Sequence, residues 1–315
     1  MRQLPENLLS EIFFESSDDK QNQEFYFDDE PLERILYGAE LNGPSPANLY
    51  APSHKYVQKI ITSCREQNLA DLISALSALA EVGLLISIET CHQLVEAIGK
   101  LFPYYPNPVV IHDITDLELL LVYIWERALE KQDVLLLSSV GIPLFRWYEH
   151  HGKYEEARQI LNKLIEIDSE FNFRASKAIH INNFAFEYLL ERRWNDAIPH
   201  FLVAAALFEE LGIPFEAANA RANYWICRFE LDEVDDIESV ETELNAIYKI
   251  LNGAKRWYER KPLILFAKIE ERRGNIVKAI TLVEKAIESA KDSNTKYPEI
   301  DRQYLEHLML KRRRP

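Results

Sequence analysis

Two asparagines, Asn182 and Asn223, carry side chains well suited to recognising a peptide. They stand 41 residues apart, and each comes two residues before a large apolar residue, Phe184 or Trp225. A carboxamide offers both a donor and an acceptor, so it can pair with the C=O and N–H of an extended peptide whatever that peptide's sequence. We therefore predict that the two asparagines clamp the backbone of a bound peptide. The alternative is that they are solvated or bond each other.

Residues two positions beyond the same apolar anchors supply further contact groups. They are Arg146, Phe186 and Cys227, followed by Lys268. On one helix face with the asparagines, they would offer cations and an aromatic surface to the side chains of a ligand. The predicted partner-binding site therefore contains Asn182, Asn223, Arg146, Phe186 and Cys227.

Residues for catalysis or metal binding are scarce. The sequence has no glycine-rich phosphate loop, no HExxH, no GxSxG and no CxxC pair. His150 and His151 cannot face one metal from a single helix side, so a surface pair is favoured over a zinc site. Arg302 and His307 resemble the Arg-x4-His pattern of HEPN-type ribonucleases. We predict a protein without enzymatic activity, cofactor or metal, and keep the ribonuclease as an alternative.

Three alanines define the frame that positions these residues. Ala157, Ala197 and Ala279 lie 40 and then 82 residues apart, and 82 is twice 41. A large apolar residue precedes each alanine by thirteen positions, and Trp225 stands halfway between the last two of these. A period of this length indicates stacked helical hairpins. The four anchors are Leu144, Phe184, Trp225 and Phe266.

The same frame marks the chain reversals. Gly152 and Gly274 stand where the first helix of a hairpin must end, in the left-handed conformation that glycine adopts at little cost. Arg192 replaces this glycine in the second unit. In the third unit Glu238 stands where the alanine is due, so we expect a lengthened acidic loop followed by a buried stripe. That stripe is Val240, Leu244, Ile247 and Leu251.

Residues 133–292 resemble the tetratricopeptide family. The likeness rests on an aromatic residue after the turn (Tyr154, Trp194), on the small alanine, and on an acidic end to the second helix at Asp168. The period exceeds the family's usual value of about 34, which implies longer helices, as in the peptide-sensing bacterial regulators. The resemblance implies an all-α, right-handed superhelical solenoid of antiparallel helix hairpins with an α-helical N-terminal region. Its first helices would line a concave surface.

Composition bounds the partners and the compartment. A net charge of −15 argues against nucleic acid, because phosphate binding needs clustered Lys and Arg. Three cysteines without CxxC spacing fit free thiols in a reducing cytosol. Because no signal pattern and no apolar run of about 20 residues is present, we expect a cytoplasmic protein that does not bind membranes. The basic run 311–314 is expected to be solvated; the alternative is a tether to an acidic partner.

We expect four parts along the chain. They are an acidic N-terminal arm or cap over residues 1–50, a helical region over 51–132, the tetratricopeptide-like repeats over 133–296, and a capping helix with a basic tail over 297–315. The end of a repeat array needs a cap because each repeat buries its face only against a neighbour.

The predicted function follows from surface and not from a reaction centre. The leading hypothesis is a non-catalytic adaptor or scaffold that binds a peptide or helix of a partner protein in its concave groove. One alternative is a peptide-responsive regulator resembling bacterial quorum-sensing sensors, without their DNA-binding part, since residues 1–130 contain no helix-turn-helix with a basic recognition helix. The other is the ribonuclease that uses Arg302 and His307.

Overall fold

The chain is built from α-helices. The computed structural model describes residues 51–313 except 67, 83, 85, 100–113, 253–255 and 291–296. These residues contain thirteen α-helices, one short 3-10 helix and no strand, which confirms the predicted all-α fold. By its internal contacts the chain divides into Met1–Ala51 and Pro52–Pro315. The predicted arm over residues 1–50 lies outside the described residues.

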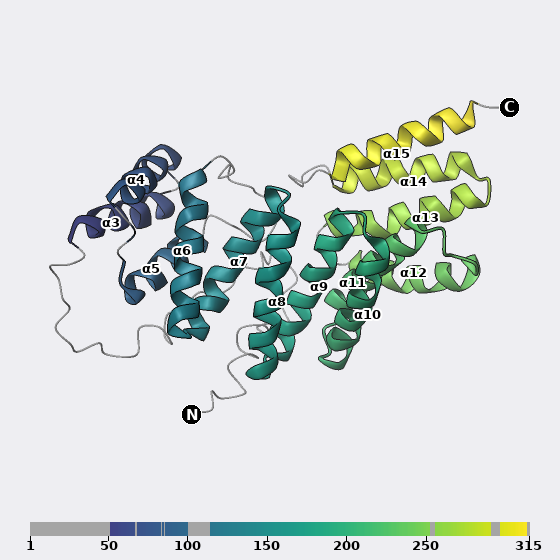
Figure 1. The fold of residues 1–315 in the computed structure, drawn as a ribbon. Coiled ribbons are helices and arrows are strands. Elements are labelled where there is room, and N and C mark those ends of the chain that lie inside the picture. The colour runs from purple at the N-terminus through teal and green to yellow at the C-terminus, as the bar shows by residue number, and fades with distance from the viewer. Residues whose placement is uncertain are drawn as a thin grey trace, which may run out of the picture. The chain divides into compact units, whose positions relative to one another are not determined.

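Helices α7 to α14 form four consecutive hairpins; α3 to α6 precede them and α15 follows them (Figure 1). We call α7, α9, α11 and α13 the first helices and α8, α10, α12 and α14 the second helices. Within each hairpin the two helices pack on each other, and each hairpin packs on the next. The bounds are α3 Ala51–Arg65, α4 Leu69–Val82, α5 Ile88–Gly99, α6 Thr115–Lys131, α7 Val134–His150, α8 Tyr154–Glu170, α9 Arg174–Leu190, α10 Trp194–Glu210, α11 Pro214–Glu230, α12 Ile237–Leu251, 3-10 helix η1 Arg256–Glu259, α13 Arg260–Arg272, α14 Ile276–Ser289 and α15 Tyr297–Arg312.

Each of the helices α6 to α11 is followed by a short turn in which one residue adopts a left-handed conformation. Helices α6 to α11 are each 17 residues long. The third residue after α7, Lys153, donates its N–H to the carbonyl of Tyr148 at 2.9 Å, which closes the helix end. The predicted reversal points Gly152, Arg192 and Gly274 have φ of 69°, 59° and 79°, so this prediction is confirmed. From α6 to α11 the left-handed residues recur every 20 positions: Gln132, Gly152, Asn172, Arg192, Gly212 and Asp232.

The three alanines of the sequence frame lie where the two helices of a hairpin meet. Ala157, Ala197 and Ala279 have no exposed surface. Their small side chains let the second helix approach the first, as expected. One further contact of this kind was not expected: at Gly141 in α7, a Cβ would lie 2.9 Å from a methyl carbon of Leu164 in α8.

The third hairpin carries its additional residues in the loop. Helix α11 ends at Glu230 and α12 begins at Ile237, so six residues connect them where three connect α9 to α10. The predicted stripe is buried at all four positions, which confirms the lengthened loop: Val240, Leu244, Ile247 and Leu251.

Because the lengthened loop comes after α11, it shifts the register of the repeats only from α12 onward. Because α7, α9 and α11 begin at residues 134, 174 and 214, their period is 40. Tyr224, and not Trp225, therefore lies at the position of Phe184. The expected equivalence of Trp225 and Phe184 is wrong by one residue, which is a rotation of about 100° around the helix.

The last helix packs on α14. It is attached by a buried pair in which Arg260, at the start of α13, donates to both carboxylate oxygens of Asp301 at 2.6 Å. Planar two-bond pairing of this kind fixes geometry as well as charge. The described residues of α15 thus continue the array past the fourth hairpin.

Replacing Gly152 by Ala should lower the free energy of unfolding by about 1 kcal/mol, because a left-handed conformation disfavours a Cβ. No atom lies within 4 Å of the added Cβ, so backbone strain alone accounts for the loss. Gly99→Ala is the control, since Gly99 also faces open space but is not left-handed. Thermal unfolding would contradict the explanation if both variants had the same effect.

Candidate functional site

The two predicted asparagines lie on consecutive first helices, Asn182 on α9 and Asn223 on α11. Asn182 is half-buried, whereas Asn223 is only 2% exposed. The Oδ1 atom of each is buried and has no hydrogen-bond partner in the described part of the chain. With the true period of 40, Asn223 corresponds to Asn183 and not to Asn182. The symmetrical surface clamp expected from the sequence is therefore not formed in this structure.

The flanking residues separate for the same reason. Arg146 and Phe186 share one helical position and are both half-buried. Arg146 donates to Glu149 at 2.7 Å. Cys227 has no exposed surface and packs in a cluster with Ala185, Ala197 and Phe201, and burial raises the pKa of its thiol to about 12. The expectation that Cys227 faces a ligand does not hold, because the residue is turned about 100° from Phe186.

A polar seam between α11 and α13 was not predicted. Lys261 Nζ donates to Asn219 Oδ1 at 2.6 Å, and Asn219 Nδ2 lies 3.4 Å from Glu216 Oε2. Burial lowers the pKa of Lys261 to about 7, and burial also raises the pKa of Glu216. Further along, Lys268 donates to Glu230 at 2.8 Å. The sequence carried a signal for this seam, since residues 216, 219 and 223 have helical spacing and share one face of α11.

Glu187 occupies a core position on α9. The equivalent residues of α7 and α11 are Trp147 and Cys227, and all three are at most 2% exposed. Oε2 of Glu187 has no partner among the described residues. Burial, followed by the charge of Glu149, raises the pKa of Glu187 to about 9. Sequence patterns gave no indication of this, because a single Glu on an otherwise amphipathic helix normally faces water.

The charges around Glu187 are already engaged. Arg146 pairs with Glu149, and Arg158 pairs with Glu155 and with Glu191. Both arginines lower the pKa of Glu187, but less than burial raises it. A protonated, neutral carboxyl group is therefore the stable form of Glu187 near neutral pH.

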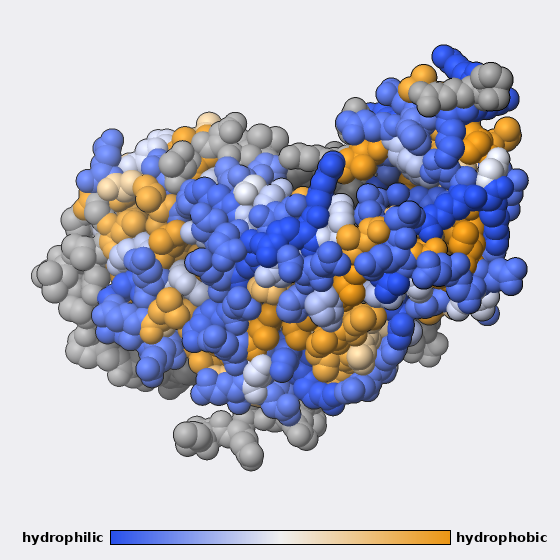
Figure 2. Space-filling model, turned by 45° about the vertical axis from the view of Figure 1, so that its right-hand side comes forward, coloured by the Kyte–Doolittle hydropathy of each residue, from blue (hydrophilic) through white to orange (hydrophobic). Residues whose placement is uncertain are grey.

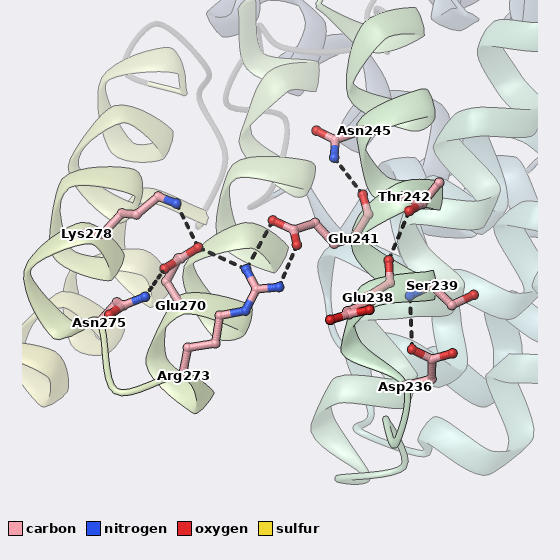
Figure 3. Close-up of polar contacts among 10 residues, drawn as sticks. All are labelled: Asp236, Glu238, Ser239, Glu241, Thr242, Asn245, Glu270, Arg273, Asn275 and Lys278. Carbon is pink, nitrogen blue, oxygen red and sulfur yellow. Dashed lines mark hydrogen bonds and ion pairs between the residues drawn. The ribbon is translucent and has the colours of Figure 1, made fainter.

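A hollow lies along α13 between α12 and α14, with a volume of about 470 Å³. Its polar rim includes Glu241 on α12 and Glu270 on α13, which share Arg273 (Figure 3). The face of the molecule drawn in Figure 2 is mostly hydrophilic, with apolar residues gathered in separate patches. We call this feature the α12–α14 hollow.

The described residues contain no assembled catalytic group. Ser176 Oγ and Asp168 Oδ2 lie 3.5 and 2.6 Å from the same nitrogen, Nδ1 of His180. A serine–histidine–aspartate relay needs the serine and the aspartate on opposite ring nitrogens, so these three residues do not form one. Arg302 and His307 are five residues apart on α15 and point about 140° apart. No cluster of three metal-ligating side chains occurs in the described ranges.

The comparison with solved structures supports the repeat architecture. The chain is similar to the protein in "Crystal Structure of the Apo Form of RapI", with 16% identity and a TM-score of 0.58 over 86% of this chain and 72% of that chain. It is also similar to BtubC (BKLC) from P. vanneervenii, with 18% identity and a TM-score of 0.49 over 78% of this chain and 91% of that one. No protein-family model and no curated protein sequence matches.

At such low identity the likeness to RapI shows the fold alone. The chain has a tetratricopeptide-like helical-repeat fold, as its sequence frame predicted. No helix within the described residues is long and apolar enough to cross a membrane.

Glu187→Gln should stabilise the protein. The raised pKa means that the folded chain retains a proton that the unfolded chain loses, so stability falls as pH rises from about 4.5 to about 9. Glutamine has nearly the same shape and cannot ionise. The gain in unfolding free energy should be larger at about pH 8 than at about pH 5, by roughly 2–4 kcal/mol. Chemical denaturation at both pH values measures it, with the exposed Glu170→Gln as control; a pH-independent effect would refute the explanation.

All three cysteines should resist thiol reagents in the folded protein. Cys64, Cys91 and Cys227 are buried, and burial raises the pKa of each thiol to about 12. Only the thiolate reacts rapidly, so Ellman's reagent should label the native chain far more slowly than the unfolded chain. Rapid native labelling of Cys227 would mean that its helix face is open after all.

Proposed function

We propose that this protein is a non-catalytic protein-interaction module, an adaptor or scaffold, that holds a peptide or helix of a partner protein on the face formed by α9, α11 and α13. The observation that carries the proposal is the carboxamide oxygen of Asn182, which has no hydrogen-bond partner among the described residues, followed by that of Asn223 on the next first helix. Buried polar atoms without partners are rare in folded proteins. A ligand that donates hydrogen bonds would satisfy them.

The two asparagines would act differently. Asn182 is half-buried, so its carboxamide can pair directly with a peptide N–H group. Asn223 is reached only when neighbouring side chains move, and such side-chain rearrangement is common when partners bind. Arg146 and Phe186, at one helical position on α7 and α9, would contact acidic and apolar side chains of the ligand.

The polar seam would bind a charged group of the ligand. Lys261 is partly exposed, and its pKa of about 7 reflects desolvation that Glu216 does not fully offset. A carboxylate placed beside Lys261 would favour its charged form and so gain affinity. Asn219 already holds the Lys261 ammonium in position.

A peptide-responsive regulator remains the alternative within the same class. The likeness in fold to RapI is compatible with it. An adaptor and a regulator differ in one respect. In a regulator, peptide binding must change the affinity of the protein for a second protein, whereas in an adaptor it need not. Residence in the cytoplasm is part of the proposal and is supported by three free cysteines. The ribonuclease alternative receives no support from the diverging Arg302 and His307.

Asn182→Ala combined with Lys261→Met should weaken partner binding by at least about tenfold, because each lost hydrogen bond to a peptide or charged group is worth roughly 1–3 kcal/mol. Affinity purification from cells, followed by titration with the purified partner, measures the loss. Lys163→Ala on the second helix α8 is the control, and circular dichroism checks that all variants are folded. Full binding by the double variant would rule out this face as the site.

A further inference from the structure

The α12–α14 hollow has an apolar floor formed by three helices. Leu263 and Phe266 of α13 line it, with Tyr248 of α12 and Leu282 of α14 on either side. On α12 the lining residues 241, 245 and 248 follow one helical stripe, as do 263, 266 and 270 on α13. Its length along α13, from residue 259 to residue 270, is roughly 16 Å at 1.5 Å per residue. Two turns of a helix fit that length.

The two ends of the hollow differ in how their acids are paired. At one end Glu270 accepts hydrogen bonds from Asn275 at 2.7 Å and Lys278 at 2.8 Å, and Arg273 joins Glu270 to Glu241 (Figure 3). At the other end Glu259 makes no hydrogen bond or ion pair with any described residue. A basic side chain entering the hollow could therefore pair with Glu259 at this second end.

Helix α15 of the same chain occupies a different side of α13. Asp301 accepts from Arg260, and Tyr304 and Lys311 both donate to Glu271, at 2.8 and 3.0 Å. Residues 260 and 271 each follow a lining residue of the hollow by one position, so they face about 100° away from it. Helix α15 of the same copy therefore does not line the hollow.

The last turns of α15 have the chemistry that matches the hollow. Met309 and Leu310 are 39% and 58% exposed, and Arg312 and Arg313 beside them are also exposed. Residues 309, 310 and 313 lie on one helix face. The segment combines two exposed apolar side chains with basic ones, whereas the hollow combines an apolar floor with four glutamates and two lysines.

We propose that the α12–α14 hollow receives the C-terminal turns of α15 from a second copy of this chain. Met309 and Leu310 enter the apolar floor, and Arg312 or Arg313 pairs with Glu259. Because the hollow and the helix end are different surfaces, the contact is head-to-tail and builds rings or open chains of copies instead of a closed dimer. The proposal is independent of peptide binding on the first helices.

The test is the concentration dependence of the mass of the full-length chain, measured by sedimentation velocity and light scattering. The wild-type mass should rise with concentration and fall with added salt, since screening weakens exposed ion pairs. Arg312→Glu/Arg313→Glu should weaken association roughly tenfold. Met309→Ser/Leu310→Ser should also weaken it. Lys131→Glu/Lys163→Glu, which makes the same change of net charge elsewhere, should not.

A charge exchange separates this contact from a general effect of charge. Glu259→Arg chains should self-associate weakly, and mixing them with Arg312→Glu/Arg313→Glu chains should restore association. A benzophenone side chain at position 285, on the wall of the hollow, should cross-link to α15 of a second copy. A wild-type chain that stays monomeric at every concentration, mixtures that fail to associate, or cross-links to other segments or to a different protein would each overturn the proposal.

Discussion

The structure depends on a fixed distance between chain reversals. A left-handed residue ends each helix from α6 to α11, and six of these residues are spaced evenly by 20 positions. Equal spacing makes the helices equal in length, so successive hairpins stack with their small alanines in register. Only Gly152 and Gly212 among these six adopt the conformation without strain from a Cβ. At Arg192 and Asp232 the fold tolerates that strain, because the packed helices on both sides determine where the chain must turn.

Much of this architecture was readable from the sequence, because it depends on local rules. Ala157 and Ala197 revealed the repeat, Gly152 and Gly274 revealed the turns, and Glu238 at an alanine position revealed the longer loop. The sequence did not predict correctly which residues of α11 face the interior. The 82 residues between Phe184 and Phe266 were divided into two equal periods of 41. The structure instead has a period of 40 from α9 to α11, and additional residues follow in the loop before α12. An error of one residue turned Cys227 and Asn223 from an expected surface into the interior.

The polar residues between helices could not be predicted in the same way. Glu187 and Lys261 are ordinary charged residues in the sequence, and their burial depends on which neighbouring helix covers them. Glu187 shares its helical position with Trp147 and Cys227, so a charged side chain stands where the other repeats place core residues. Such a group lowers stability at neutral pH. We infer that these sites restrict which helix faces can pack together more than they strengthen the fold.

The first helices of the last two hairpins are joined by charge. Lys261, Lys268 and Arg272 of α13 bond to Asn219, Glu230 and Asp232 along α11 or just beyond its end. These cations offset part of the negative charge of −15 within the array itself. A net negative charge repels polyanions and attracts basic segments at long range. Lys261 and Arg146 would act on acidic groups of a ligand only at short range, once the ligand is in contact.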